Sequence, residues 1–237
     1  MGKISKEEFL KNLNKYRNEV FAKWNAKILN ICKGGYGEGD FLWGVRVPQQ
    51  RFIVKKYLEK INLKDVEELL QHKIHEVRLS SLMILIEKYK RADEESKSYI
   101  VKIYLRNSKY INNWDLVDLS APNIVGHYWY NTSLTDLWNF AKSGNLWQER
   151  IAMLSTFYFI KQKRFAETLT LVKIFLKHKH ALMHKAAGWM LREVGKQDVK
   201  TLTSFLDKYV HVMPRTMLRY SIERLSLKQR KYYLEKK

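Results

Sequence analysis

Cysteine is almost absent from this 237-residue sequence, in which Cys32 stands alone. A single cysteine excludes an internal disulfide, and it excludes zinc and iron–sulfur sites that are built from several cysteines. Any catalytic chemistry must therefore use other groups. Cys32 itself is expected to be a small residue of the core.

Proline and glycine are also scarce, with 3 and 10 residues in the chain, fewer than average usage of about 5% and 7% would give. Both residues interrupt helices, so their scarcity favours long helices. Four of the glycines lie close together, and residues 33–40 are therefore predicted to form the main flexible loop. Strand-like alternation of apolar and polar residues does not extend over any length.

Long hydrophobic runs are missing as well. No apolar run approaches the roughly 18 residues that a membrane-spanning helix needs. Residues 1–27 are charged throughout and lack the apolar core of a signal peptide. We therefore expect the chain to stay in the cytoplasm.

Acidic residues are greatly outnumbered: 24 Asp and Glu stand against 44 Lys and Arg, for a net charge of +20. Such a field attracts polyanions and speeds their encounter with the protein, so nucleic acid or an acidic membrane surface is the first partner to consider. Because 46% of the residues are hydrophobic, the chain can bury a sizeable core, which excludes global disorder.

What the sequence does contain is helical periodicity. Apolar residues recur at the spacing of one helix face, as at Leu182, Ala186 and Met190. The predicted helices lie near 5–17, 20–32, 48–60, 64–72, 75–90, 93–107, 112–125, 133–142, 145–162, 165–177, 181–195, 198–210 and 214–235. Since short connections make neighbours pack antiparallel, we predict an all-α fold: an α-solenoid of HEAT-like antiparallel helix pairs with a concave basic groove, forming one domain over 1–237. A compact irregular bundle is the alternative.

Asp118 is a carboxylate on an apolar helical stripe, four residues after Trp114. Burying it without a partner would cost on the order of several kcal/mol, so its presence needs a reason. Asp115 has one, because Asn112 is a plausible N-cap and a carboxylate three residues later meets the positive helix end. Asp118 is thus part of a buried ion pair, an exposed groove residue or a functional carboxylate.

Two further helical stripes combine cationic residues with apolar or aromatic ones. Arg150 shares its helix face with three apolar residues and should have an anionic partner, either an acidic side chain or a phosphate. The other stripe consists of Lys185, Trp189, Arg192 and Lys196. A tryptophan within a line of cations is typical of a surface that contacts a nucleic-acid backbone, although it also fits an indole that is half-buried between solvated lysines.

The spacing of these residues relates them to one another. Arg150 follows Trp114 by 36 residues, and Trp189 follows Arg150 by 39. Both intervals are close to the repeat of about 40 residues in HEAT-like helix pairs. Equivalent positions of successive repeats project to the same side of a solenoid. We therefore expect Trp114, Asp118, Arg150 and Trp189 to converge on one basic groove.

Four segments resemble, in order, the successive motifs of the AlkD-type DNA alkylation-repair glycosylases. They read NWDLVD at 113–118, LWQERIAML at 146–154, HKAAGWMLRE at 184–193 and MPRTMLRY at 213–220. An earlier segment, GVRVP at 44–48, is similar to the first motif of that family. The resemblance extends from about residue 30 to the C-terminus, and four motifs in order are more specific than any one of them.

The resemblance implies HEAT-like repeats wrapped around duplex DNA and hydrolysis of the N-glycosidic bond of cationic alkylated purines. It implies that Asp118 is the catalytic aspartate, that Trp114 and Trp189 bracket the deoxyribose of the lesion, and that Arg150 holds the nearby backbone. The alkylated base already carries a positive charge and leaves without a general acid, so a single anion suffices. The resemblance also implies that the damaged base stays stacked in the duplex.

The resemblance implies further that Arg46 and Pro48 belong to a loop that faces the duplex. We expect the C-terminal Arg215 and Arg219 to bind phosphates, and Lys185 and Arg192 to contact the backbone. Gln148 and Glu149 depart from the family, which often has a second arginine there, and so does 177–180, where the family often has acidic residues. These departures bear on DNA affinity and lesion preference more than on the chemistry.

We therefore expect a monomeric glycosylase that acts on double-stranded DNA containing methylated or bulkier alkylated purines. It should be cytoplasmic, associated with the nucleoid when it is bound to DNA, and should not contact a membrane. We expect no cofactor and no metal ion, because His180 and His184 lack the neighbouring glutamate of a zinc-binding helix motif. One alternative is a catalytically silent solenoid that recognises damaged or branched DNA. The other is a protein-interaction scaffold, as many α-solenoids are.

Overall fold

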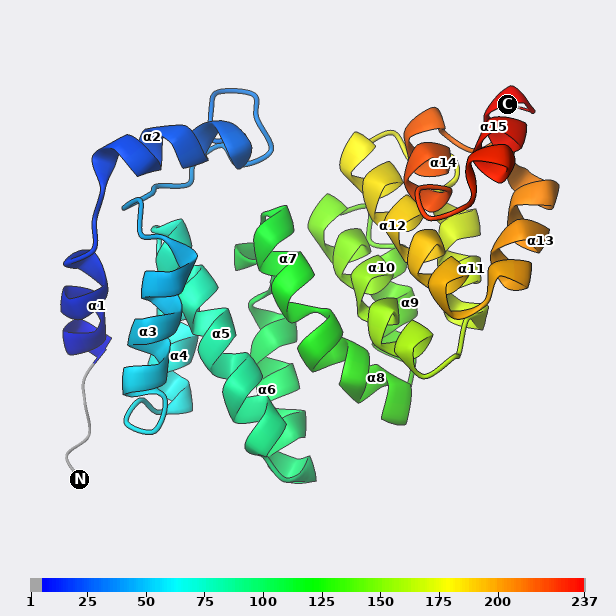
Figure 1. Cartoon of the computed structure of the whole chain (residues 1–237). Helices are drawn as coiled ribbons and strands as arrows, with labels where there is room; N and C mark the ends of the chain where they lie inside the picture. The colour runs from blue at the N-terminus through cyan, green and yellow to red at the C-terminus, as the bar shows by residue number, and fades with distance from the viewer. Residues whose placement is uncertain (1–5, 237) are drawn as a thin grey trace. The chain divides into compact units, whose positions relative to one another are not determined.

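The computed structural model describes residues 6–236, which form helices and connecting turns and hold no β-strand (Figure 1). The all-α prediction is confirmed, and the packing of successive helices is consistent with an α-solenoid. The chain divides into two compact units: unit 1 ends at Ser120 and unit 2 begins at Ala121. The single domain over 1–237 and the concave basic groove stay predictions.

Unit 1 is built around one long helix. Its elements are α1 (Lys6–Asn14), α2 (Glu19–Ile28), α3 (Val47–Tyr57), α4 (Leu63–Leu70), α5 (His75–Arg91), α6 (Glu94–Arg106), the 3-10 turn η1 (Ser108–Tyr110) and α7 (Trp114–Ser120). Helix α5 packs against α3, α4, α6 and α7. It has no glycine or proline, and all of its residues from His75 to Ile86 are buried, the polar ones included.

Unit 2 is built around two long helices, α10 and α12. Its elements are the π-helical turn η2 (Pro122–Gly126), α8 (His127–Asn131), α9 (Thr135–Ala141), α10 (Leu146–Lys161), α11 (Ala166–Phe175), α12 (Ala181–Gln197), α13 (Val199–Tyr209), α14 (Arg215–Ser221) and α15 (Leu227–Glu235). Helix α12 packs against α10, α11, α13 and α14. Gly188 makes the approach of α14 possible, because a Cβ atom there would lie 2.5 Å from the carbonyl oxygen of Met217.

Three expectations from the sequence differ from the structure. The helix predicted over 112–125 begins at Trp114, and after Ser120 it continues as the π-helical turn η2, in which the Gly126 N–H donates to the Ala121 carbonyl over 2.8 Å. The helix predicted over 214–235 is interrupted, and α15 starts with a new capping box at Ser226. Cys32 was expected in the core and is instead exposed.

Among residues 6–236, no helix combines the length and the apolar character that crossing a bilayer requires.

Candidate active site

Helix α7 carries two of the predicted site residues on one face. Trp114 is its first residue and Asp118 lies one turn further on, and both side chains are half-buried. The opposite face is anchored in unit 1, where Leu116 and Val117 are fully buried. Ser120 is also buried and lies 2.9 Å from the hydroxyl of Tyr104.

Asp118 lies close enough to Tyr104 to influence it electrostatically. Burial raises the pKa of the Tyr104 hydroxyl, the hydrogen bond with Ser120 opposes this rise, and the negative charge of Asp118 adds to it. The phenol therefore stays neutral. The Asp118 carboxylate thus has a fully buried tyrosine on the unit 1 side while its own side chain is still partly accessible.

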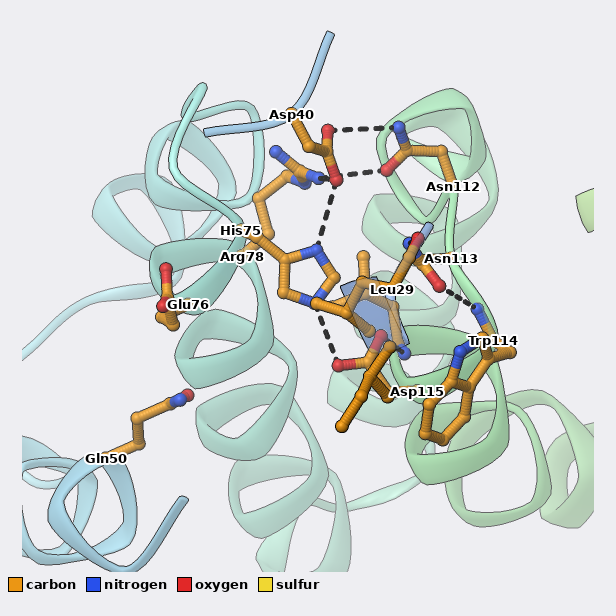
Figure 2. Close-up of polar contacts among 12 residues, drawn as sticks. Leu29, Asp40, Gln50, His75, Glu76, Arg78, Asn112, Asn113, Trp114 and Asp115 are labelled. Atoms are coloured by element: carbon orange, nitrogen blue, oxygen red, sulfur yellow. Dashed lines mark hydrogen bonds and ion pairs between the residues drawn. The ribbon is translucent and has the colours of Figure 1, made fainter. Parts of the chain in front are cut away.

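A network of buried polar groups supports the start of α7 (Figure 2). At its centre is His75, the first residue of α5, whose side chain is 1% exposed. Its Nδ1 lies 3.1 Å from Asp40 Oδ2, and its Nε2 lies 2.8 Å from Asp115 Oδ2. The other oxygen of Asp115 accepts the N–H of Leu116 over 2.9 Å. Asp115 therefore joins the first turn of α7 to His75, in addition to the role at the helix terminus that the sequence predicted.

Arg78 and Asn112 complete this network. Arg78 Nη2 donates to Asp40 over 2.6 Å and to the Asn112 side-chain oxygen over 2.9 Å. Asn112 was predicted to cap α7, but its side chain bonds Arg78 and Asp40 instead. The neighbouring Asn113 accepts the Trp114 N–H over 2.8 Å and donates to the Leu29 carbonyl over 3.1 Å, so the N-cap prediction is wrong by one residue.

The pKa values in the network follow from these contacts. Burial lowers the pKa of the His75 ring, but the charge of Asp115 and the hydrogen bonds to Asp115 and Asp40 outweigh it and raise the pKa to about 9. Burial acts to raise the pKa of Asp40, but the hydrogen bond from His75 and the charge of Arg78 outweigh it, so the pKa lies below its ordinary value. Near neutral pH, the ring is therefore an imidazolium between two carboxylates.

A second buried carboxylate shapes the loop before α3. Glu76 accepts the backbone N–H groups of Trp43, Gly44 and Val45 over 3.1, 2.7 and 3.3 Å. Gly44 has a positive φ of 77° and passes so close to the Asn18 carbonyl that a Cβ atom would not fit. Glu76 thus fixes the backbone immediately before Arg46.

The predicted loop residues Arg46 and Pro48 lie on the surface of unit 1. Both are exposed, and Pro48 occupies the first turn of α3. The Arg46 guanidinium lies 4.7 Å from the centre of the Phe21 ring, which in turn stacks on Trp24. Both side chains are therefore accessible within unit 1, and their contact with a duplex stays a prediction.

A cleft of about 300 Å³ lies in unit 1 beside α7. Trp114, Asp115 and Leu119 of α7 line one side of it, together with His75. The remaining walls come from α2, the loop before α3, α3 itself and further residues of α5. The half-buried face of α7 therefore borders a concave surface, the kind of surface in which ligands bind.

Arg150 and Glu149 lie at the start of α10 in unit 2. Arg150 is 4% exposed, and its Nη1 donates to the Leu182 carbonyl of α12 over 2.6 Å. The partner in this contact is a neutral carbonyl oxygen, and the anionic partner stays a prediction. Glu149, a departure from the family, lies 2.9 Å from the ring Nε2 of His178.

The segment 177–180, the other departure, caps α12. His180 Nδ1 accepts the Leu182 N–H over 3.1 Å, and His178 Nδ1 accepts the His180 N–H over 3.0 Å. Burial lowers the pKa of His180, as do the charges of His178 and Arg150. No sequence pattern predicted this role, because histidine is an unusual N-cap.

Acidic neighbours partly neutralise the cations of the stripe on α12. Trp189 Nε1 and Lys196 Nζ both donate to Glu193, over 3.0 and 2.8 Å. Arg192 forms an ion pair with Glu223. Lys185 is exposed. The predicted contacts of these residues with a DNA backbone stay predictions.

The two C-terminal arginines lie on the surface of α14. Arg215 and Arg219 are both exposed, and Arg215 Nη1 donates to the Leu234 carbonyl of α15 over 2.9 Å. Their binding of phosphates stays a prediction. So does the convergence of the four central residues, because Trp114 and Asp118 belong to unit 1 whereas Arg150 and Trp189 belong to unit 2.

Sequence reasoning did not find Asp40, His75 or Arg78. The available signal was a group of titratable residues, His75, Glu76 and Arg78, just before the apolar middle of the same helix, residues 82–86. Three or more histidine, cysteine, aspartate or glutamate residues arranged to hold a metal ion do not occur in the part of the chain that is described, residues 6–236.

Comparisons with known proteins indicate the family of the chain and its fold. Residues 9–225 match the model of a protein family described as "DNA alkylation repair enzyme". The structure is similar to that of a protein titled "Predicted DNA alkylation repair enzyme from Enterococcus faecalis", with a TM-score of 0.70 and 16% sequence identity over 89% of this chain and 97% of the other. That likeness concerns the fold. No curated protein matches the chain.

Proposed function

This chain belongs to the DNA alkylation repair enzyme family, and we propose that it is a DNA glycosylase that hydrolyses the N-glycosidic bond of cationic N-alkylated purines in duplex DNA. The substrates would carry methyl groups or bulkier adducts. The net charge of +20 suits a polyanionic partner. The observation that carries the proposal is the half-buried face of α7, on which Asp118 lies one turn after Trp114, a residue that lines the cleft.

A half-buried carboxylate is well suited to stabilising a transient cation. Partial burial of Asp118 reduces the screening of its charge by water, yet the group remains accessible to substrate. Leu116 and Val117 hold the helix from the opposite side, so the carboxylate does not have to be ordered when the substrate binds. Asp118 therefore has both the charge and the fixed position that the reaction needs.

The proposed reaction begins with cleavage of the bond between C1′ and the purine nitrogen. The electron pair leaves with the purine and neutralises the positive charge of the base, while the deoxyribose becomes an oxocarbenium-like cation. At about 4 Å and an effective dielectric constant of about 20, Asp118 could stabilise that cation by up to about 4 kcal/mol, or roughly a thousandfold in rate. A water molecule oriented by Asp118 then attacks C1′ and loses its proton to the carboxylate or to solvent.

Binding is proposed to use residues of both units on the sugar and the backbone. Trp114 and Trp189 would each contact the deoxyribose of the lesion, and Arg150 the nearby backbone. Arg46 and Pro48 would face the duplex. The base would stay stacked, in contrast to glycosylases that draw the nucleotide into a pocket. The protein would act as a monomer in the cytoplasm, with Lys185, Arg192, Arg215 and Arg219 on the phosphates.

Release of free base from methylated duplex DNA tests this proposal. We expect Asp118→Asn to reduce the rate by at least about a hundredfold while DNA binding persists, because the amide cannot stabilise the cation. Asp136→Asn, which changes an exposed aspartate in α9, is the matched control and should keep the wild-type rate. Full activity of Asp118→Asn would exclude Asp118 as the catalytic residue. A wild-type protein that binds alkylated duplex without releasing base would be the silent DNA-binding protein instead.

A further inference from the structure

His75 is enclosed by groups of opposite charge. Its ring is 1% exposed, with Asp40 at Nδ1 and Asp115 at Nε2. The carboxylates come from two different parts of unit 1, since Asp40 precedes a backbone bridge in which Phe41 pairs with the residues before α5, and Asp115 belongs to α7. The imidazole ring therefore lies between Asp40, the last residue of the loop 33–40, and Asp115 of α7 (Figure 2).

The two contacts fix the protonation state of the ring. A neutral imidazole has one N–H donor and one lone pair, whereas an ionised carboxylate only accepts hydrogen bonds. At the observed 3.1 and 2.8 Å, a neutral ring would place its lone pair against one of the carboxylate oxygens. Only the doubly protonated ring donates to both Asp40 and Asp115.

The charges around the ring balance in that state. Asp40 and Asp115 carry two negative charges, and His75 and Arg78 carry two positive ones. Arg78, which also lies on α5, forms an ion pair with Asp40. Glu76 and Arg51 line the same cleft as His75. Glu76 accepts three backbone N–H groups of the loop before α3. Loss of the His75 proton would leave one buried negative charge of the network unbalanced.

The network ends at the first turn of α7. Asp115 uses one oxygen for His75 and the other for the Leu116 N–H, so the ring and the helix backbone are connected through a single side chain. Trp114 precedes Asp115 directly, and Asp118 follows it by three residues, which is less than one helical turn. A displacement at Asp115 is therefore passed to both neighbours.

We propose that His75, as an imidazolium bonded to Asp40 and Asp115, is a positioning residue that fixes the first turn of α7 and thereby the directions of Trp114 and Asp118. The proposal rests on the glycosylase function proposed above. His75 acts through Asp115 and not on the substrate. Its protonation makes the geometry of α7 depend on pH, so that alkali relaxes the start of the helix.

The kinetic test compares His75→Gln with the wild type in base release from methylated duplex DNA. Glutamine keeps one donor but not the charge, so we expect kcat to fall about tenfold with little change in KM, since a small misplacement of a catalytic group costs rate more than binding. The kcat of the wild type should decline as the pH rises through about 9, and that of His75→Gln should not. His211→Gln, which changes an exposed histidine, is the control and should behave as the wild type.

A second variant serves if His75→Gln does not fold. Asp115→Asn leaves the ring with one carboxylate, so the alkaline decline of kcat should move toward neutral pH. If His75→Gln keeps the wild-type kcat together with its alkaline decline, or if Asp115→Asn leaves the position of that decline unchanged, the positioning role is wrong.

NMR titration of the His75 ring protons in the full chain, without DNA, separates this proposal from the proposed function. We expect the ring to titrate near pH 9 in the wild type and at lower pH in Asp115→Asn. Titration near the ordinary value of about 6.5 would overturn the imidazolium bridge even in an active enzyme. A wild-type protein that releases no base, with His75 titrating near pH 9, would overturn the glycosylase function and the positioning role in it, but not the bridge.

Discussion

The two units of this chain use histidine in opposite ways. In unit 1, His75 is enclosed between two carboxylates, and its contacts require a proton on each ring nitrogen. In unit 2, the half-exposed His178 and His180 each accept a backbone N–H at the start of α12, and these contacts require a ring nitrogen without a proton. The partner of a histidine, rather than the residue type, therefore decides which protonation state the fold needs.

Opposite protonation states give opposite pH dependences. The folded-state pKa of His75 is raised to about 9, so the stability it contributes is complete below about 6.5 and is lost as the pH rises through 9. The folded-state pKa of His180 is lowered, so its contribution is complete above about 6.5 and is lost as the pH falls below that value. Alkali should loosen unit 1, and acid should loosen unit 2.

The largest effect is expected from removing a carboxylate of unit 1. Asp40→Ala leaves His75 and Arg78 without their shared buried partner, and we expect a loss of about 3–5 kcal/mol in the free energy of unfolding. Glu149→Ala, which removes the partner of the half-exposed His178, is the matched change in unit 2 and should cost about 1 kcal/mol. Urea unfolding near neutral pH measures both, and equal losses would contradict the comparison.

An intermediate effect is expected from alkali. Between about pH 6.5 and 9, the wild type should lose up to about 3 kcal/mol of unfolding free energy from the His75 proton. Hydrogen exchange, corrected for the intrinsic pH dependence, should show that loss in α5 and α7 and not in α12. His75→Gln should remove the alkaline loss. If α7 and α12 lose protection together, the assignment of alkali sensitivity to unit 1 is wrong.

The smallest effect is expected from the cap of α12. Protonation of His180 below about pH 6.5 removes the acceptor of the Leu182 N–H, at a cost of about 1 kcal/mol that is confined to the first turn of the helix. His180→Asn supplies an acceptor that does not titrate, so exchange at the start of α12 should become independent of pH in this range. Unchanged acid sensitivity in that variant would locate the titrating group elsewhere.

The sequence predicted well whatever depends on near neighbours. Helical spacing and the scarcity of glycine and proline were enough to predict the all-α fold and most of the helices. The helical spacing predicted that Asp118 and Trp114 share one face, and the structure places both on the half-buried face of α7. These features concern residues within one helix, where periodicity determines which side chains share a face.

The sequence could not predict what depends on partners far along the chain. His75 bonds Asp40 and Asp115, which are 35 and 40 residues away, and no periodic pattern relates the three. Asn112 and Asn113 are equally good caps by composition, and the choice between them depends on the Leu29 carbonyl and on Arg78. Cys32 is exposed because α2 ends at Ile28 and Cys32 lies in the connection that follows, where residue type indicates burial poorly.

The glycine at position 188 determines how α12 and α14 tolerate change. Gly188, which directly precedes Trp189 on α12, lies against the main chain of α14 at Met217. A contact made by backbone atoms is insensitive to which side chains α14 presents to solvent. The outward residues of α14, Arg215 and Arg219 among them, can therefore vary without altering the helix spacing beside Trp189, whereas any side chain larger than hydrogen at 188 would push the two helices apart.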